Sequence, residues 1–341
     1  MKKVKIGIVG LGRLGKRHAY NLSRLVPGAE LVAACSPVSS ECEWARITLE
    51  VPHTYASYDE MLSRESLDAV WIASSSVHHA AQVLYALELG LHVFVEKPMG
   101  VTLEECAAIE KAAAAHLGQV FLIGFVRRFD PSYRHARALI DAGTIGTPFL
   151  VRSQTCDLDE YAEFQLEFVK TGGGIFLDMN VHDIDLARWF LGSEIVEVHA
   201  MGGSYVHPGF AALGDADNTV CIAKCANGAM AVLSASRTAF HGHDTHTEIT
   251  GSRGILKIGL TPSKNRVEIF DSHGARRECV RDFYERFEEG FLAEAREFVS
   301  CILEGRKPDV RPQDGTAATR VGMAMTESFR TGAPVRIPID T

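Results

Sequence analysis

The sequence lacks two features that would point to particular partners. No apolar run approaches the roughly 20 residues that a membrane-spanning helix needs, and no excess of basic residues is present, since the formal net charge of the 341 residues is −8. A protein that binds nucleic acid usually presents a basic face. Internal repeats, low-complexity segments and flexible linkers are also absent. We therefore expect neither a nucleic acid nor a membrane as a partner.

The eight cysteines form neither a disulfide framework nor a metal motif, because they are scattered among apolar neighbours. Cys221 and Cys225 lie four residues apart in a strand-like segment, with no second pair nearby to complete a zinc site. Residues 1–7 are typical of a strand rather than of a signal peptide. We expect reduced thiols, no metal and a cytoplasmic location.

Hydrophobic residues make up 46% of the chain and charged residues 23%, and the length favours two domains. Residues 1–125 alternate apolar strands with helices, which predicts a doubly wound parallel sheet. Thr102 and Glu105 form a capping box at the start of one of these helices. The expected strands are 4–10, 30–35, 68–74, 92–96 and 119–125, and the expected helices include 13–25 and 80–90.

Residues 126–341 differ in character, because short alternating strands follow one another with few helices between them. Asn227-Gly228, between two apolar alternating runs, indicates a β-hairpin. The segment 284–303 is helical in pattern. These observations predict a second α/β domain with a large, open and mostly antiparallel sheet, with strands at 148–155, 196–201, 219–224, 229–236, 247–250 and 267–270.

The segment Gly10-Leu11-Gly12-Arg13-Leu14-Gly15 follows the first expected strand and opens a helix. This context is the one that marks a dinucleotide-binding fingerprint, in which the glycines shape a tight turn and the helix N-terminus faces the pyrophosphate. NAD-binding proteins usually place Asp or Glu after the second strand, whereas this chain has Ser36. NAD and NADP both remain open as the cofactor, and Arg13 is a candidate for the neighbourhood of a 2′-phosphate.

Two further segments carry groups suited to acid–base chemistry. Lys97, in Glu96-Lys97-Pro98, directly follows a buried strand, where side chains face the ligand crevice of a doubly wound sheet. If a helix begins near Asp178, then Asp178, His182 and Asp185 share one of its faces. His182 is matched to removing a hydroxyl proton. A solvated lysine and a structural Asp–His pair are the alternatives.

Together these segments resemble the glucose–fructose oxidoreductase / inositol dehydrogenase family along essentially the whole chain, and most closely its inositol 2-dehydrogenase branch. The Glu-Lys-Pro and Asp-x-x-x-His motifs are the most specific to that family. The segments that carry the resemblance are the fingerprint with His18, residues 73–76 with His79, 96–98, 124–130, 178–182 and 284–287.

The resemblance implies an NAD(P)-dependent dehydrogenase that acts on a polyol or sugar and that assembles as a homotetramer or homodimer. It implies that Lys97 holds the substrate hydroxyl, His182 acts as the base and Asp178 supports them, so that Lys97 and His182 act on one secondary alcohol. The implied substrate-binding residues are Arg127, Asp157, Asp185 and His243. The cofactor-binding residues are expected to be Gly10, Gly12, Arg13, Leu14, Gly15, Ser36, Ser74, Ser75, His79, Glu96 and Lys97.

Two departures from the family pattern bear on specificity. His243 stands where the family has a tyrosine near the substrate, and Ser36 replaces the cofactor carboxylate. His241, His243 and His246 are expected on a substrate-facing or solvated loop rather than at a metal, since no cluster of Cys or carboxylates accompanies them. The expected reaction is oxidation of myo- or scyllo-inositol to the ketone. The alternatives are an aldose 1-dehydrogenase or sugar-ketone reductase, an NAD-dependent hydrolase or eliminating enzyme, and a cofactor-binding sensor without chemistry.

Overall fold

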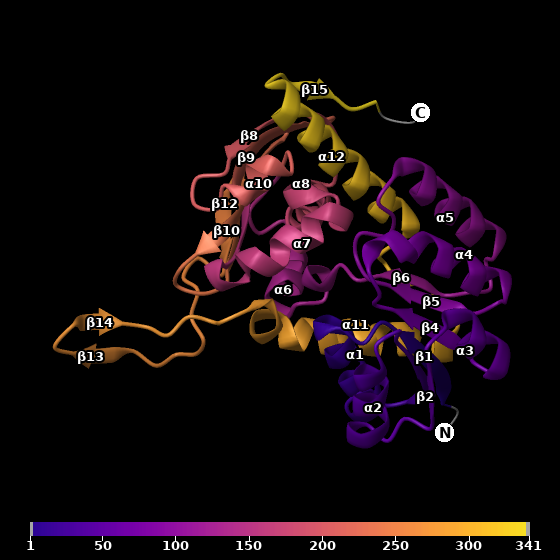
Figure 1. Ribbon diagram of the computed structural model, residues 1–341. Helices are drawn as coiled ribbons and strands as arrows, with labels where there is room; N and C mark the ends of the chain where they lie inside the picture. The colour runs from indigo at the N-terminus through magenta and orange to yellow at the C-terminus, as the bar shows by residue number, and fades with distance from the viewer. Residues whose placement is uncertain (1–2, 339–341) are drawn as a thin grey trace. The chain divides into compact units, whose positions relative to one another are not determined.

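The computed structural model describes residues 3–338, which form two compact units (Figure 1). The first unit contains the chain up to Val126 together with Glu289–Thr316, and the second contains Arg127–Glu288 and the chain from Ala317 onward. The expected domains, 1–125 and 126–341, differ from these units in the segment 289–316, which packs with the N-terminal unit. The outer ends of the expected domains, residues 1–2 and 339–341, lie outside the described residues.

The first unit is built on a six-stranded, fully parallel sheet with the strand order β3-β2-β1-β4-β5-β6. The order reverses between β1 and β4, and ligands of doubly wound sheets bind beyond the carboxyl ends of the strands at such a point. The predicted parallel sheet is therefore confirmed. Its strands are β1 (Val4–Val9), β2 (Ala29–Cys35), β3 (His53–Tyr55), β4 (Ala69–Ile72), β5 (His92–Val95) and β6 (Phe121–Ile123).

Helices cover both faces of this sheet. On one face, His18 of α1 lies against the rings of Trp71 and of Phe291 from α11. Tyr58 of α3 meets Tyr85 of α4 edge to face, which places these two helices side by side. Thr102 forms the predicted capping box with Glu105. The helices are α1 (Arg13–Arg24), α2 (Ser39–Thr48), α3 (Tyr58–Arg64), α4 (His79–Glu88), α5 (Leu103–Ala115) and α11 (Phe283–Glu304).

The second unit is built on a seven-stranded sheet with the order β12-β11-β7-β10-β9-β8-β15. Adjacent strands of this sheet pair antiparallel, except for β7 and β10, which run parallel. Gly228, with φ at +86°, lies in the predicted hairpin between β9 and β10. The strands are β7 (Pro148–Leu158), β8 (Ile195–Gly203), β9 (Asn218–Cys225), β10 (Met230–Ala239), β11 (Asp244–Gly251), β12 (Gly254–Ile258) and β15 (Val335–Arg336), and β13 (Ile269–Asp271) pairs with β14 (Gly274–Arg276) as a separate hairpin.

The expectation of few helices in the second domain is wrong. Asp130 caps α6 through the backbone N–H groups of Ser132 and Tyr133, and Pro131 occupies its first turn. The pattern is a regular helix start, but it lies just where the sequence suggested a change to strands. The helices are α6 (Pro131–Asp141), α7 (Ala162–Gly172), α8 (Gly174–Asp178), α9 (Val181–Leu191), α10 (Gly209–Ala212) and α12 (Pro312–Thr331). Within residues 3–338, no helix combines the length and the apolar character of a membrane span.

Candidate active site

The fingerprint glycines form the turn between β1 and α1. A Cβ on Gly10, whose φ is +89°, would lie 2.4 Å from the carbonyl oxygen of Ala73, and one on Gly15 would lie 1.9 Å from the carbonyl oxygen of Gly10. A Cβ on Gly12 would meet nothing within 4 Å. Open space at Gly12 and an α1 N-terminus that no side chain caps fit a dinucleotide pyrophosphate. Arg13 and Leu14 are the first residues of α1.

The loop after β4 and the turn after β5 are tied together by His79. Its Nδ1 lies 2.8 Å from the carbonyl oxygen of Pro98, and its Nε2 lies 3.0 Å from that of Ser74. Burial lowers the pKa of His79 and outweighs these two carbonyl groups, which raise it. The Ser74 hydroxyl donates to Oε1 of Gln82 at 2.6 Å, and Ser75 precedes the short turn Ser76–His78. His79 therefore holds in place the turn that carries Lys97.

Lys97 is half-buried and follows β5 in a cis peptide with Pro98. Glu96 beside it is buried: its Oε1 lies 2.7 Å from Nε2 of His18, and its Oε2 accepts the backbone N–H of Lys97 at 3.1 Å. A Cβ at Gly124 would lie 2.9 Å from the Glu96 carboxylate, so only glycine leaves room for it. The Glu96 carboxylate therefore positions the backbone of Lys97.

A second acid, Glu294 of α11, completes what we call the acidic cluster: His18, Glu96 and Glu294. One ligand atom from each lies within 4.8 Å of the others, and all three residues are buried. The three groups could hold a metal ion, but His18 and the Lys97 N–H already engage the Glu96 oxygens. Burial, and then the neighbouring Glu96, raises the pKa of Glu294 well above the ordinary value. Glu294 is therefore protonated, and a proton rather than a metal ion neutralises its charge.

Sequence reasoning missed Glu294, although a signal was present. Phe291 lies three residues before it and Phe298 four residues after it, and both are buried with it and with the adjacent Ala295, so the acid stands in the middle of the apolar face of α11. An acid on such a face is rare unless it is paired.

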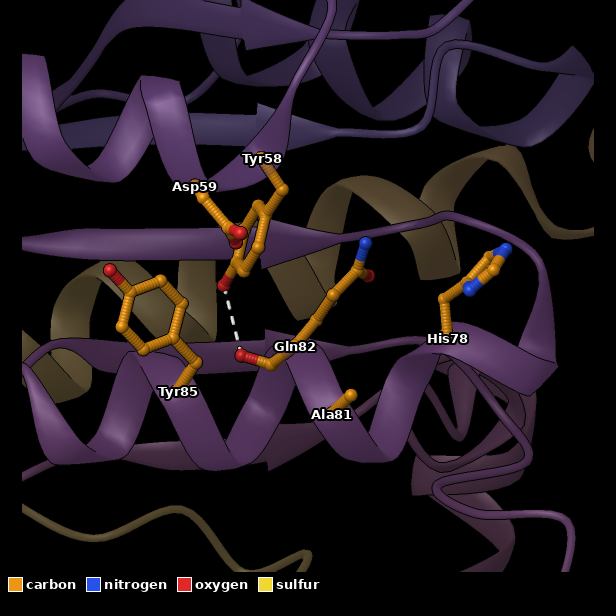
Figure 2. A pocket seen from close by; sticks show the side chains of 6 residues that line it. All are labelled: Tyr58, Asp59, His78, Ala81, Gln82 and Tyr85. Carbon is orange, nitrogen blue, oxygen red and sulfur yellow. Dashed lines mark hydrogen bonds between the residues drawn. The ribbon is translucent and has the colours of Figure 1, made fainter.

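A cavity of about 350 Å³ opens between α3 and α4 of the first unit (Figure 2). The Tyr58 hydroxyl donates to the carbonyl oxygen of Gln82 at 2.9 Å across it. The aromatic rings of Tyr58 and Tyr85 and the side-chain amide of Gln82 are suited to contact a flat ligand group. Its lining residues are Tyr58, Asp59, His78, Ala81, Gln82 and Tyr85.

In the second unit, the expected single helix through Asp178 and His182 is two helices. The helix α8 ends at Asp178, Met179 and Asn180 form the junction, and α9 begins at Val181. The expectation that Asp178, His182 and Asp185 share one helical face is therefore wrong. His182 and Asp185 lie on α9, while Asp178 comes from the end of the preceding helix; Asp178 and His182 are half-buried.

Two buried arginine–aspartate pairs hold α9. The Arg127 guanidinium donates to Oδ1 of Asp183 at 2.7 Å, and Arg128 donates to both oxygens of Asp185 at 2.7 and 2.5 Å. The Asp183 carboxylate also accepts from Thr155, Ser153 and Asn180. Sequence reasoning gave no role to Arg128 or Asp183. The predicted substrate residues Arg127 and Asp185 are thus both engaged in buried ion pairs.

The other predicted substrate residues meet directly. Nδ1 of His243 lies 3.0 Å from Oδ1 of Asp157, whose second oxygen accepts the Gln165 amide at 3.0 Å. His243 is buried and Asp157 half-buried. His241 and His246 instead lie beside Asp244, at 3.4 and 3.5 Å, on the strand β11 and the loop before it. Ser36, the remaining predicted residue, is buried at the end of β2 and donates to Glu41 at 2.5 Å.

Comparison with known proteins matches both units. The chain is 37% identical over 338 residues to a scyllo-inositol 2-dehydrogenase (NAD(+)) from Bacillus subtilis, covering 99% of this chain and 97% of that protein. It is 31% identical to a myo-inositol 2-dehydrogenase from Thermotoga maritima, over 98% of each. The crystal structure of a scyllo-inositol dehydrogenase from Lactobacillus casei with bound NAD(H) and scyllo-inositol superposes with a TM-score of 0.95, at 39% identity, over 98% of this chain and 99% of that one.

Two family models match the chain as well. Residues 4–125 match the oxidoreductase family with an NAD-binding Rossmann fold, and residues 133–257 match the GFO/IDH/MocA C-terminal domain. The resemblance expected from the motifs is confirmed. The chain has an open glycine turn after β1, a lysine after β5 and a histidine on α9. It belongs to the GFO/IDH/MocA family of NAD-binding oxidoreductases.

Proposed function

We propose that this protein oxidises a secondary hydroxyl of myo- or scyllo-inositol to the keto-inositol, with a nicotinamide cofactor as the hydride acceptor. One observation carries the proposal: the chain is 37% identical, over nearly its full length, to a scyllo-inositol 2-dehydrogenase. The residue types that alcohol oxidation requires, Lys97 and His182, stand in the motifs of that family.

In this proposal each residue has a separate task. Lys97 holds the reacting hydroxyl, and His182 takes its proton as the hydride leaves the carbon. Asp178 supports these two groups. The Glu96 carboxylate and His79 keep the backbone around Lys97 in place. When bound, the nicotinamide supplies the position to which the hydride is transferred.

The polar side chains of the second unit support a substrate with many hydroxyl groups. His243 and Asp157 form a hydrogen-bonded pair in which the half-buried carboxylate can receive a further hydroxyl. A site built to pair with hydroxyls rejects analogues that lack them. In this proposal Arg127 and Asp185 have two tasks. Each forms a buried ion pair that fixes the position of α9, and each adds a polar group near the substrate.

The test is a screen of the purified protein for NADH and NADPH production with inositol isomers and with aldoses. We expect turnover of myo- or scyllo-inositol, and a loss of about 10²–10⁴-fold in kcat for His182→Ala, because a general base contributes that much. His135→Ala, in an exposed histidine of α6, is the matched control and should retain activity.

The outcomes separate the alternatives. Turnover of aldoses without inositol would identify an aldose 1-dehydrogenase, and cofactor binding without turnover of any polyol would favour a sensor. Full activity in His182→Ala would refute the role of His182 as the base and leave the proposed reaction in place.

We also propose that the protein is a homo-oligomer, assembled through the outer face of the seven-stranded sheet. Side chains of β9 alternate between buried and exposed, and two of the three exposed residues, Val220 and Ile222, are apolar. Val220 pairs with Met201 of β8, and Ile222 pairs with Val232 of β10. Met201, Val220 and Ile222 are 54%, 40% and 55% exposed. A contiguous apolar patch of this kind suits a second copy of the same face.

Light scattering on the purified protein tests this assembly. We expect a dimer or tetramer, and Ile222→Glu should shift it toward monomers, whereas Lys111→Glu, at an exposed lysine of α5, should not. A monomeric wild-type protein at micromolar concentration would contradict the proposal.

Within a cell, we propose a cytoplasmic location. Burial raises the pKa of the Cys221 and Cys301 thiols to about 12. All eight cysteines are free thiols, which is usual for proteins of a reducing compartment.

A further inference from the structure

The second strand of the cofactor-binding sheet ends at Ser36, where NAD-binding proteins commonly carry a carboxylate for the ribose hydroxyls. The structure places a carboxylate there from another element. Glu41, in the first turn of α2, accepts the Ser36 hydroxyl at 2.5 Å from Oγ to Oε2. Glu41 lies five positions after Ser36 in the sequence.

The geometry of Ser36 directs this contact. Its side chain is buried, and its backbone N–H donates to the carbonyl oxygen of Tyr55 on β3. The Ser36 Oγ accepts the backbone N–H of Val38 at 3.1 Å, and the Ser36 hydroxyl donates its proton to Glu41. The hydroxyl thus holds one carboxylate oxygen and leaves the other for a second partner. Glu41 is half-buried, which leaves that oxygen within reach of a ligand.

The contact lies beside the fingerprint. Cys35, the last residue of β2, pairs with Val9 of β1, and its carbonyl oxygen accepts the N–H of Gly10 at 2.9 Å. Strands β1 and β2 are parallel, so their carboxyl ends, with Gly10 and Ser36, lie at the same edge of the sheet. That edge is where a dinucleotide bound at residues 10–15 extends its adenosine ribose.

Acidic side chains lie near this edge. Burial, and then the nearby Cys42, Asp59 and Glu60, raise the pKa of the Cys35 thiol to about 12. The first turn of α1 carries two cations, Arg13, which is exposed, and Lys16, whose Nζ lies 5.4 Å from the centre of the Trp44 ring on α2. A 2′-phosphate at this edge would add up to two negative charges close to the Glu41 carboxylate.

We propose that Glu41, oriented by Ser36, is the residue that selects NAD over NADP, replacing the acid that the second strand lacks. Its carboxylate accepts the ribose hydroxyls of NAD and repels the 2′-phosphate of NADP. The inference rests on the nicotinamide part of the proposed function and is independent of the identity of the polyol.

The experiment measures the dissociation constants of NADH and NADPH from their fluorescence, with the whole protein and without substrate. We expect the wild-type protein to bind NADH at least about tenfold more tightly than NADPH, the ratio that 1.4 kcal/mol produces. Glu41→Gln should reduce this ratio by about tenfold, because the charge that repels the phosphate is lost. Ser36→Ala should change the ratio in the same direction by less, because it removes the group that orients the carboxylate.

Glu43→Gln is the matched control, since Glu43 is an exposed acid on the same helix, and it should leave the ratio unchanged. Melting curves show whether each variant is folded, and the ratio of two affinities in one sample does not depend on the active fraction. Equal affinities in the wild-type protein, or an unchanged ratio in Glu41→Gln, would overturn the inference.

The same measurement separates the inference from the proposed function. Selective NADH binding without inositol turnover would leave Glu41 in its role and refute the substrate. Inositol oxidation with equal use of both cofactors would refute the role of Glu41 alone. A protein that binds neither NADH nor NADPH would refute both.

Discussion

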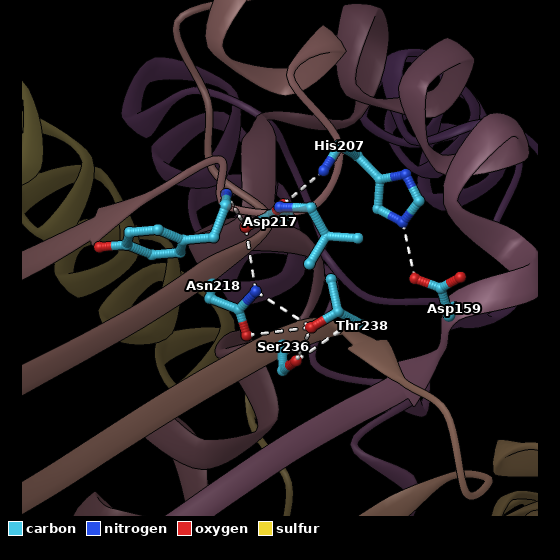
Figure 3. A network of polar contacts seen from close by, with 8 residues as sticks. Asp159, His207, Asp217, Asn218, Ser236 and Thr238 are labelled. Carbon is cyan, nitrogen blue, oxygen red and sulfur yellow. Dashed lines mark hydrogen bonds and ion pairs between the residues drawn. The ribbon is translucent and has the colours of Figure 1, made fainter.

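Asp217 in the second unit and Glu294 in the first are both fully buried carboxylic acids, at 0% exposure, yet their pKa values move in opposite directions. Asp217 lies before β9 and accepts three backbone N–H groups, those of Tyr205, Val206 and His207 (Figure 3). The Asn218 amide donates to it as well, at 2.9 Å. Burial raises the pKa of Asp217, but these donors outweigh it, and the net shift is downward.

Glu294 has no such donors. Among the described residues, neither of its oxygens has a hydrogen-bond partner, and its charged neighbour is the Glu96 carboxylate. Burial and Glu96 both raise its pKa, so Glu294 stays protonated where Asp217 is ionised. Burial alone therefore does not set the charge of an interior acid in this protein. The number of donors that face it does.

The largest effect that would test this contrast comes from Asp217→Ala. Three backbone N–H groups would lose their acceptor inside the protein, and each unsatisfied buried group is costly. We expect a loss of roughly 2–4 kcal/mol in the free energy of unfolding, measured by urea denaturation of the whole protein.

Asp159→Ala is the control for Asp217→Ala. Asp159 pairs with His207 at 2.6 Å in the same network, but its side chain is 26% exposed (Figure 3). An exposed pair of this kind contributes about 1 kcal/mol or less. Equal losses in the two variants would contradict the importance of the buried N–H donors.

A smaller effect is expected from Glu294→Gln, and it depends on pH. The folded protein keeps the Glu294 proton above the unfolded pKa of 4.5. The free energy of unfolding of the wild-type protein therefore falls as pH rises from there to the raised folded pKa, by up to about 1.4 kcal/mol per pH unit. The glutamine variant lacks this decline, so we expect its free energy of unfolding to increase relative to that of the wild-type protein as pH rises above 4.5.

Melting and urea denaturation at a series of pH values measure that gain. Glu289→Gln, in an exposed acid of the same helix, should show a difference from the wild-type protein that does not change with pH. A pH-independent difference for Glu294→Gln as well would mean that Glu294 is ionised in the folded protein, and the contrast with Asp217 would fail.

Much of the fold could be predicted from local patterns. The fingerprint glycines, the Thr102 capping box and the Asn227-Gly228 hairpin depend on a few neighbouring residues, and all three are present. The interruption at Met179 and Asn180 could not be predicted, because Asp178 and His182 keep helical spacing in sequence while α8 ends and α9 begins between them. The site roles of Lys97, Asp178 and His182 remain predictions.

The sequence by itself determined where the backbone turns after the first strand, because the glycines at residues 10–15 are recognisable from their spacing along the chain. It also showed that the second strand ends without an acid, at Ser36. Only the tertiary structure decided that Glu41 stands in that place and that Glu294 lies beside Glu96. The physical reason is that hydrogen bonds and charge states depend on distances between segments, which no local pattern contains.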